Sequence, residues 1–197
     1  MKRIAFLTVL LLSMSATFAQ GRVEFKWYGL YTVLDYSYAV NMGKDAPCLE
    51  GEEGSLSFSE LTGIVGFQIR KETGVGLGFS YMIDPSEGYT QMPVYVELRS
   101  HYFRSRLTPF SVLKLGYTMP MGEFSGGEES ININKGGVFL GVELGGRFAV
   151  THGFAVSLHV GYQMIMMGEV EYVHDGLLAQ RVPVQLHLVK AGLGINF

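Results

Sequence analysis

Charged side chains at alternate positions of otherwise apolar segments are the residues of this chain that could do chemistry. Glutamates, lysines and arginines recur on the less apolar face of these segments, and His101 and His159 share that face. Because a charge enclosed in a protein interior needs a partner, we expect the two signs to pair. We predict an interior charge network that consists of Glu60, Arg70, Glu97, Arg99, Lys114, Glu143, Arg147 and Lys190.

Such a network has two functional interpretations. In the first, the charges fill a narrow interior and have a structural role. In the second, they line a narrow, gated path for ions. Glu143 and Arg147 are four residues apart on one segment, too far to pair directly, so each should find its partner on another segment. The chain has no His-x-x-x-His spacing and no cysteine cluster, and we expect no metal, cofactor or catalytic residue.

Eight alternating segments must position these charges. They cover about residues 23–41, 61–69, 75–83, 94–102, 113–119, 138–150, 154–166 and 189–197. The segment with the most regular pattern has Val138, Leu140, Val142 and Leu144 at every second position, whereas the phase of the first segment is unclear. Strict alternation over this length indicates strands whose two faces meet different environments.

The connections between the segments alternate between long and short. The links at Lys71–Thr73, Arg104–Leu107 and Thr151–His152 are tight, whereas residues near 42–55, 85–91, 121–136 and 168–182 form long polar connections. The long connections are acidic, with Asp45, Glu50, Glu52, Glu53, Asp84, Glu87, Glu123, Glu128, Glu129, Glu169, Glu171 and Asp175. Long loops at one end and short turns at the other are typical of outer-membrane barrels.

The composition of the two faces predicts which one meets lipid. The less apolar face combines its charges with many glycines, such as Gly76, Gly78, Gly141 and Gly161, as expected where long side chains need small neighbours in a narrow lumen. On the apolar face, aromatic residues lie near the ends of the segments and aliphatic residues lie between them, as in the aromatic girdles of membrane barrels. A soluble barrel would instead turn its apolar face inward.

The first residues predict export. Lys2 and Arg3 precede the apolar run Ile4 to Leu12, and Thr17 and Ala19 are small residues at the positions that a signal peptidase inspects. We expect a signal peptide over residues 1–19 and an outer-membrane barrel domain over 20–197. Loss of Lys2 and Arg3 takes the net charge from −3 to −5, which argues against nucleic-acid partners. The single cysteine, Cys48, excludes an intramolecular disulfide.

With these features, the chain resembles the small eight-stranded outer-membrane β-barrel proteins, a porin-like group of the OmpA/OmpX type. The resemblance covers about residues 22–197 and rests on four stretches: Met92-Pro93-Val94-Tyr95-Val96, Pro109-Phe110 with Leu115-Gly116-Tyr117, Gly145-Gly146-Arg147, and Ile195-Asn196-Phe197. It implies an all-β, antiparallel, up-and-down transmembrane barrel. It also implies insertion by the barrel-assembly machinery, with Phe197 as the assembly signal.

The expected function is a structural or surface-binding role in the bacterial outer membrane, as a monomer among outer-membrane lipids and lipopolysaccharide. The first alternative is a small-solute porin. The second is an enzyme that modifies lipid A, although His187 lies on the lipid side without a serine on its strand, and Ser100 lies near the opposite end. A secreted lipocalin-like binder is the third alternative.

Overall fold

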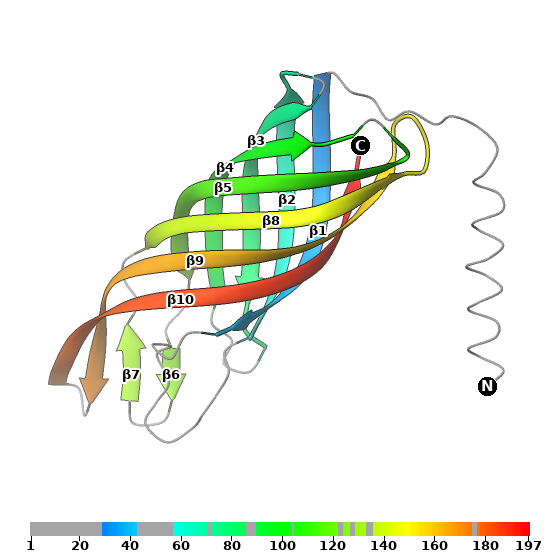
Figure 1. Ribbon diagram of the computed structural model, residues 1–197. Helices are drawn as coiled ribbons and strands as arrows, with labels where there is room; N and C mark the ends of the chain where they lie inside the picture. Colours follow the sequence, from blue (N-terminus) through cyan, green and yellow to red (C-terminus); the bar gives the residue numbers. More distant parts are fainter. Residues whose placement is uncertain are drawn as a thin grey trace, which may run out of the picture.

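The computed structural model shows a barrel of antiparallel strands (Figure 1). It describes residues 29–42, 57–70, 72–85, 90–103, 105–121, 124–126, 129–132, 136–174 and 177–197, with backbone only for 124–126, 129–132, 168–174 and 177–184. The predicted signal peptide, Cys48 and most of the acidic residues of the predicted loops lie outside the described residues or side chains. No helix that could cross a membrane occurs in the part of the chain that the structure describes.

Eight strands form the barrel wall, and two short strands belong to one of its connections. The wall consists of β1 (Gly29–Asn41), β2 (Ser57–Gln68), β3 (Thr73–Ile83), β4 (Thr90–His101), β5 (Leu107–Met121), β8 (Gly137–Ala149), β9 (Ala155–His174) and β10 (Leu177–Asn196). The short strands are β6 (Phe124–Gly126) and β7 (Glu129–Asn132). Each wall strand pairs antiparallel with the next one in this order.

The barrel closes where the last strand meets the first. β10 pairs with β1 from Val33 opposite Asn196 to Asn41 opposite Leu188. Beyond this ladder, the backbone N–H of Thr32 donates to the carbonyl of Phe197 at 3.1 Å, and the N–H of Phe197 donates back at 2.9 Å. Closure leaves the eight-stranded wall without an open edge, as a β-structure inside a bilayer requires.

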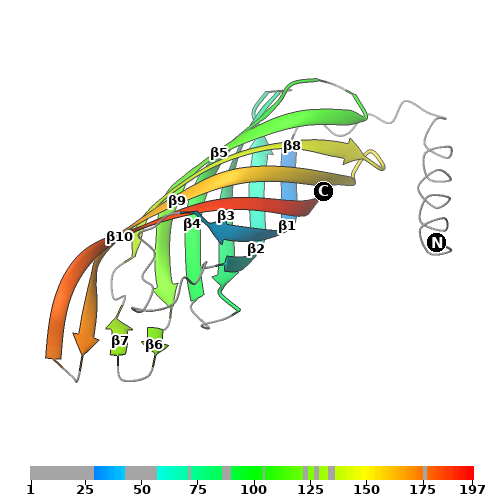
Figure 2. The same ribbon diagram turned by 60° about the horizontal axis from the view of Figure 1, so that its bottom comes forward.

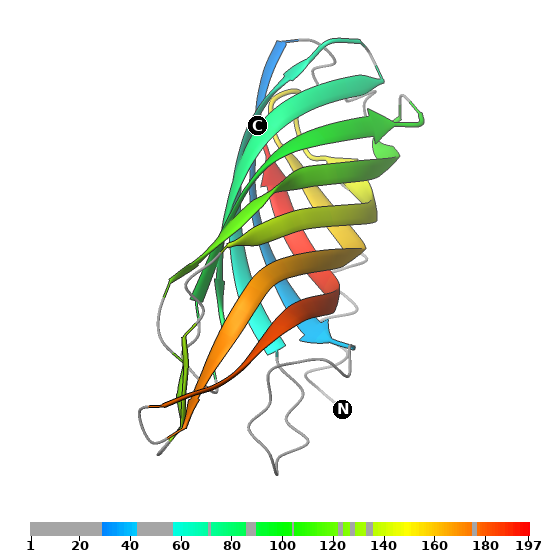
Figure 3. The same ribbon diagram turned by 90° about the vertical axis from the view of Figure 1, so that its left-hand side faces the viewer.

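The two ends of the barrel differ in their connections. Phe197 lies at the same end as the tight turns that join β2 to β3, β4 to β5 and β8 to β9 (Figure 1). At the other end, β9 and β10 extend further than the other wall strands. They have 20 residues each, whereas the other wall strands have 11 to 15 residues. Figures 2 and 3 show this β9–β10 hairpin projecting beyond the wall.

The structure corrects two of the predicted long loops. The stretch 168–182 is mainly paired strand, with Glu171 opposite Arg181 and Val170 opposite Val182. The stretch 121–136 contains β6 and β7, and β7 pairs with β9 from Glu129 opposite His174 to Asn132 opposite Glu171. Val170, Tyr172 and Val173 favour extended backbone, and this local preference carries the strands past the predicted loop boundary.

The wall has an apolar exterior and a polar interior. On β8, Val142 and Leu144 are exposed while Gly141 and Glu143 are buried, so the predicted phase of this strand is confirmed. On β1, whose phase the sequence left open, Leu34, Tyr36 and Tyr38 face outward and Asp35 faces inward. Leu158 and Leu193 expose 61% and 58% of their surfaces. A continuous apolar exterior is far larger than the patches of soluble proteins, so this is a transmembrane barrel.

Candidate functional site in the barrel interior

Four charged side chains from four strands meet in the interior and form what we call the central cluster: Glu60, Lys114, Glu143 and Lys190. The ammonium Nζ of Lys190 lies 3.1 Å from Glu60 Oε2 and 2.7 Å from Glu143 Oε1. The ammonium of Lys114 lies 2.5 Å from the same Glu143 oxygen. All four side chains are almost completely buried. The cluster is neutral as a whole, which is the condition under which buried charges are tolerated.

Polar neighbours complete the coordination of Glu60. The hydroxyl groups of Ser37 and Thr62 each donate to its carboxylate at 3.2 Å. The amide Nε2 of Gln163 donates to Oε2 at 3.2 Å from the far side of the barrel. These contacts join β1, β2, β9 and β10 across the lumen, so the cluster acts as an internal cross-brace.

A second ion pair lies on β4. The guanidinium of Arg99 donates to Glu97 through Nε at 3.1 Å and through Nη2 at 3.3 Å, and the Tyr31 hydroxyl donates to Glu97 at 3.0 Å. The guanidinium carbon also lies 5.1 Å from the centroid of the Phe110 ring. Residues two apart on a strand share a face, so this pair needs no partner from across the barrel.

The two buried histidines, His159 and His101, contact different residues. The Nδ1 atom of His159 is 3.3 Å from the carboxylate Oδ2 of Asp35. The ring of His101 packs 6.2 Å from that of Phe110. Among the described residues, no three histidine, cysteine, aspartate or glutamate side chains are grouped as a metal site would require.

The structure places the predicted network residues as follows. Seven are buried in the interior: Glu60, Glu97, Arg99, Lys114, Glu143, Arg147 and Lys190. Arg70 is not one of them, and its inclusion was wrong. β2 ends at Gln68, and Arg70 lies exposed in the following turn, where its N–H donates to the carbonyl of Thr73 at 3.0 Å. Strand alternation therefore no longer applies to its side chain.

Sequence reasoning missed many members of the interior polar set, among them Tyr31, Asp35 and Gln163. Asp35 and Tyr31 lie on β1, whose phase was unclear, and the odd numbering shared by Val33, Asp35 and Ser37 was the signal that could have found them. Asp84 was counted with the acidic loops, but it is completely buried directly after β3.

Glycines give the long interior side chains their space. A Cβ atom at Gly161 would lie 2.8 Å from Cγ of Glu143, and one at Gly192 would lie 2.6 Å from the ring of His159. A Cβ atom at Gly66 would lie 2.2 Å from the ring of Tyr31. The predicted relation between small residues and large interior side chains therefore holds at these positions.

An apolar layer covers the central cluster on the side of the long connections. On three strands, the interior residue two positions nearer the long connections is apolar: Phe58 beside Glu60, Ile165 beside Gln163 and Leu188 beside Lys190. Beside Lys114 and Glu143 this position is a glycine. Leu186 pairs with Ile165 and Ile165 pairs with Phe139, which joins the layer across β10, β9 and β8. The layer consists of Phe58, Met82, Phe139, Ile165, Leu186 and Leu188, all at most 1% exposed.

A small cavity remains beside the central cluster. It is lined by Val33, Asp35, Ile64, Arg99, Phe110, Lys114, Glu143, Ser157 and His159. Its volume is about 10 Å³, enough for about one water molecule. The interior is therefore packed at this level.

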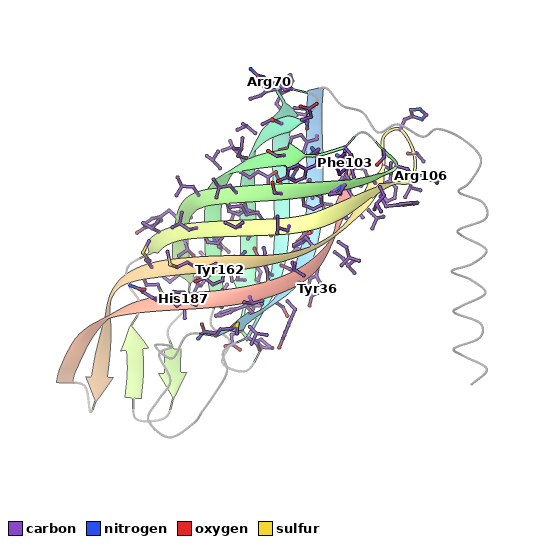
Figure 4. The ribbon with its side chains drawn as sticks, viewed as in Figure 1. Tyr36, Arg70, Phe103, Arg106, Tyr162 and His187 are labelled. Atoms are coloured by element: carbon purple, nitrogen blue, oxygen red, sulfur yellow. The ribbon has the colours of Figure 1, made fainter. Side chains whose placement is uncertain are left out.

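On the outer surface, His187 contacts Tyr162. The tyrosine hydroxyl lies 2.5 Å from Nδ1 of His187, and the two rings stack with centroids 6.1 Å apart (Figure 4). Both side chains point away from the interior. His101 and His159 lie inside, so the wall separates them from His187.

Comparison with known proteins identifies the fold. No family model and no curated protein match this chain. Among solved structures, Neisserial surface protein A is similar at 16% identity and a TM-score of 0.59, over 85% of this chain and 96% of that one. The outer membrane protein OprG from Pseudomonas aeruginosa is similar at 15% identity and a TM-score of 0.58, over 88% of this chain and 98% of that one.

The closed eight-stranded wall and its apolar exterior define the class of this protein. Antiparallel barrels that turn apolar residues outward are the form in which β-strands cross the bacterial outer membrane. The chain therefore has the fold of the small eight-stranded outer-membrane β-barrel proteins. The fold alone assigns no activity, because barrels of one architecture have different functions.

Proposed function

We propose that this protein is a non-conducting outer-membrane barrel with a structural or surface-binding role. The observation that carries the proposal is the packed lumen, in which the apolar layer lies directly over the ion-paired central cluster. Before it reached the central cluster, an ion entering from the side of the long connections would have to pass buried Phe58, Ile165 and Leu188, which lie among buried polar residues such as Asn41 and Gln91. It would then meet charges that already have partners at 2.5 to 3.1 Å.

The surface-binding part of the proposal rests on the long connections. Loops on a rigid scaffold often carry function. At this end, the paired strands β9–β10 and β6–β7 provide such a scaffold for the long connections. Their acidic composition favours divalent cations or basic protein surfaces as ligands. Lipopolysaccharide and outer-membrane lipids surround the wall, with the protein as a monomer.

Assembly is proposed to use the barrel-assembly machinery, with Phe197 as the recognition signal. Phe197 follows β10 directly, keeps 48% of its surface exposed, and has its ring 5.6 Å from that of Phe154. The side chain is thus available at the rim where β10 closes on β1.

Single-channel recording in a planar bilayer tests the closed lumen. The wild-type barrel should give no discrete conductance steps. As a positive control, the combined variant Phe58→Ala/Leu188→Ala should open the apolar layer and raise leakage through the barrel. Stable conductance by the folded wild-type protein would contradict the proposal and favour the narrow-porin alternative.

A further inference from the structure

The end of the barrel with the tight turns has a cationic rim. By sequence, the turn after β2 carries Arg70, Lys71 and Glu72, and the turn after β4 carries Arg104 and Arg106. Of these residues, the structure describes Arg70, Glu72 and Arg106. Arg70 is exposed, and Figure 4 shows Arg70 and Arg106 at the same end of the wall. This sign is opposite to that of the long connections, so the molecule is polarised along its axis.

Arg106 is held in place by contacts with β8. Its backbone carbonyl accepts from the N–H of Ala149 at 2.8 Å, and its Nε donates to the carbonyl of Ala149 at 3.2 Å. Its guanidinium carbon lies 4.9 Å from the centroid of the Phe148 ring. A planar cation that is stacked on a ring loses little conformational freedom when it binds a phosphate.

Exposed aromatic side chains show the depth at which this guanidinium lies. Tyr102 and Phe103, in the same turn, expose 57% and 64% of their surfaces, and the Tyr102 hydroxyl is 2.8 Å from Ser111 Oγ on the outer face. Tyrosine and phenylalanine girdles occupy the boundary between hydrocarbon and headgroups. The guanidinium of Arg106 therefore lies at the level of lipid headgroups.

We propose that this rim binds the phosphate groups of anionic phospholipids in the periplasmic leaflet, with Arg106 as the oriented contact and Arg70 as a second. The sign of the rim selects an anion, and the adjoining aromatic residues select a ligand that also has acyl chains. A cell-wall polymer would satisfy the first condition only. The inference rests on the transmembrane barrel and is independent of whether the lumen conducts.

Lipid selectivity tests the proposal. The full mature barrel is reconstituted in phosphatidylcholine bilayers with spin-labelled phosphatidylglycerol or spin-labelled phosphatidylcholine, and electron spin resonance measures the share of motionally restricted label. Phosphatidylglycerol should be preferred by about twofold or more at low salt, and the preference should decline as salt is added. The variant Arg70→Gln/Arg106→Gln should remove it, and Arg106→Lys should keep only part of it.

Lys135→Gln is the matched control, because it removes one positive charge from the connection between β7 and β8 at the opposite end. It should leave the selectivity unchanged. Heat-dependent electrophoretic mobility shows that each variant is folded, and Arg70→Gln alone alters only an exposed turn residue.

Several results would overturn the inference. They are equal binding of both labelled lipids by the wild type, a preference that persists in the folded double variant, or displacement by inorganic phosphate beyond that by sodium chloride of matched ionic strength. Retention on purified cell-wall sacculi that depends on Arg70 and Arg106, without lipid selectivity, would assign the rim to the cell wall instead. Conductance in the planar bilayer would contradict the closed lumen and leave the lipid result unaffected.

Discussion

Glu143 is the residue on which the central cluster depends most, because one of its oxygens contacts both Lys114 and Lys190. The sequence predicted only that its partner would come from another strand. The structure supplies two such partners, from β5 and β10. Lys190 also contacts Glu60, whereas Glu143 is the cluster carboxylate that Lys114 contacts.

Replacement of Glu143 by glutamine should therefore destabilise the barrel. The change leaves the Lys114 ammonium buried with its carboxylate partner removed, and breaking one side of a buried ion pair costs about 3–5 kcal/mol. Urea unfolding of the barrel in lipid vesicles measures this loss. Export to the membrane should persist.

The double variant Lys114→Met/Glu143→Gln is the matched control. It removes both charges and leaves the Lys190–Glu60 pair in place, so it should be more stable than Glu143→Gln alone. Equal stability of Glu143→Gln and the wild type, with altered ion conductance, would mean that the lumen is wet.

Two interior glycines that look alike in the sequence should respond differently to alanine. A Cβ atom at Gly78 would lie 2.2 Å from the ring of Tyr95, which is 2% exposed and stacks on Phe139 with ring centroids 5.2 Å apart. Gly78→Ala should cost about 1–3 kcal/mol through overpacking. At Gly141 the nearest atom is 3.4 Å away, so Gly141→Ala should be nearly neutral in the same unfolding titration.

At the scale of the strand, alternation gives each wall element one face for lipid and one for the lumen. β8 has the most regular alternation, and its exposed residues Val138 and Val142 lie at different depths, near the strand end and in its middle. The cost of a charge on the lipid face depends on depth. This pair therefore measures both the phase of the strand and its position in the bilayer.

Val142→Arg should destabilise the barrel by about 2–4 kcal/mol, because it places a cation near the middle of the apolar belt. Val138→Arg, next to the strand end at Gly137, should cost about 0–1 kcal/mol. Folding titrations in lipid vesicles compare the two. A neutral result at Val142 would contradict the transmembrane orientation of β8.

The β9–β10 hairpin is longer than the sequence pattern predicted. Its polar residues suggested a loop, but the backbone remains paired to Leu177 opposite His174, with irregularities in register between Leu178 and Gln180 and between Pro183 and Gln185. Pairing depends on the partner strand as well as on local composition. Two of the acidic residues at this end, Glu169 and Glu171, therefore belong to paired strand.

At the scale of the molecule, a barrel with charges of opposite sign at its two ends has a defined orientation in the membrane. Because outer-membrane barrels have short periplasmic turns and long extracellular loops, we propose that the tight turns and Phe197 face the periplasm and the long hairpins lie outside. The apolar layer and the central cluster lie between them.

Cell fractionation checks the predicted location and processing together. The mature protein should be found in the outer membrane, with Gln20 as its first residue after cleavage behind Ala19. N-terminal sequencing of the membrane fraction identifies the cleavage site. Recovery from the soluble periplasm would support the lipocalin-like alternative.

Alternation in the sequence predicts the eight wall strands, the faces of all but the first, and the class of fold, because alternation is a local property that each segment shows on its own. It placed Glu60, Lys114, Glu143 and Lys190 on the interior face for the same reason. Arg70 failed because alternation ends where a strand ends, and the sequence does not mark that point to one residue.

Which interior groups meet depends on the register and closure of the folded barrel. Lys190 reaches Glu60 and Glu143 because the register of β10 with β1 and β9, and the closure of the wall, bring three strands to one level of the lumen. The apolar layer has the same origin, since Phe58, Phe139 and Leu188 become neighbours of the cluster through strand tilt and register. These relations connect residues up to 130 positions apart, as for Glu60 and Lys190, and no local pattern encodes them.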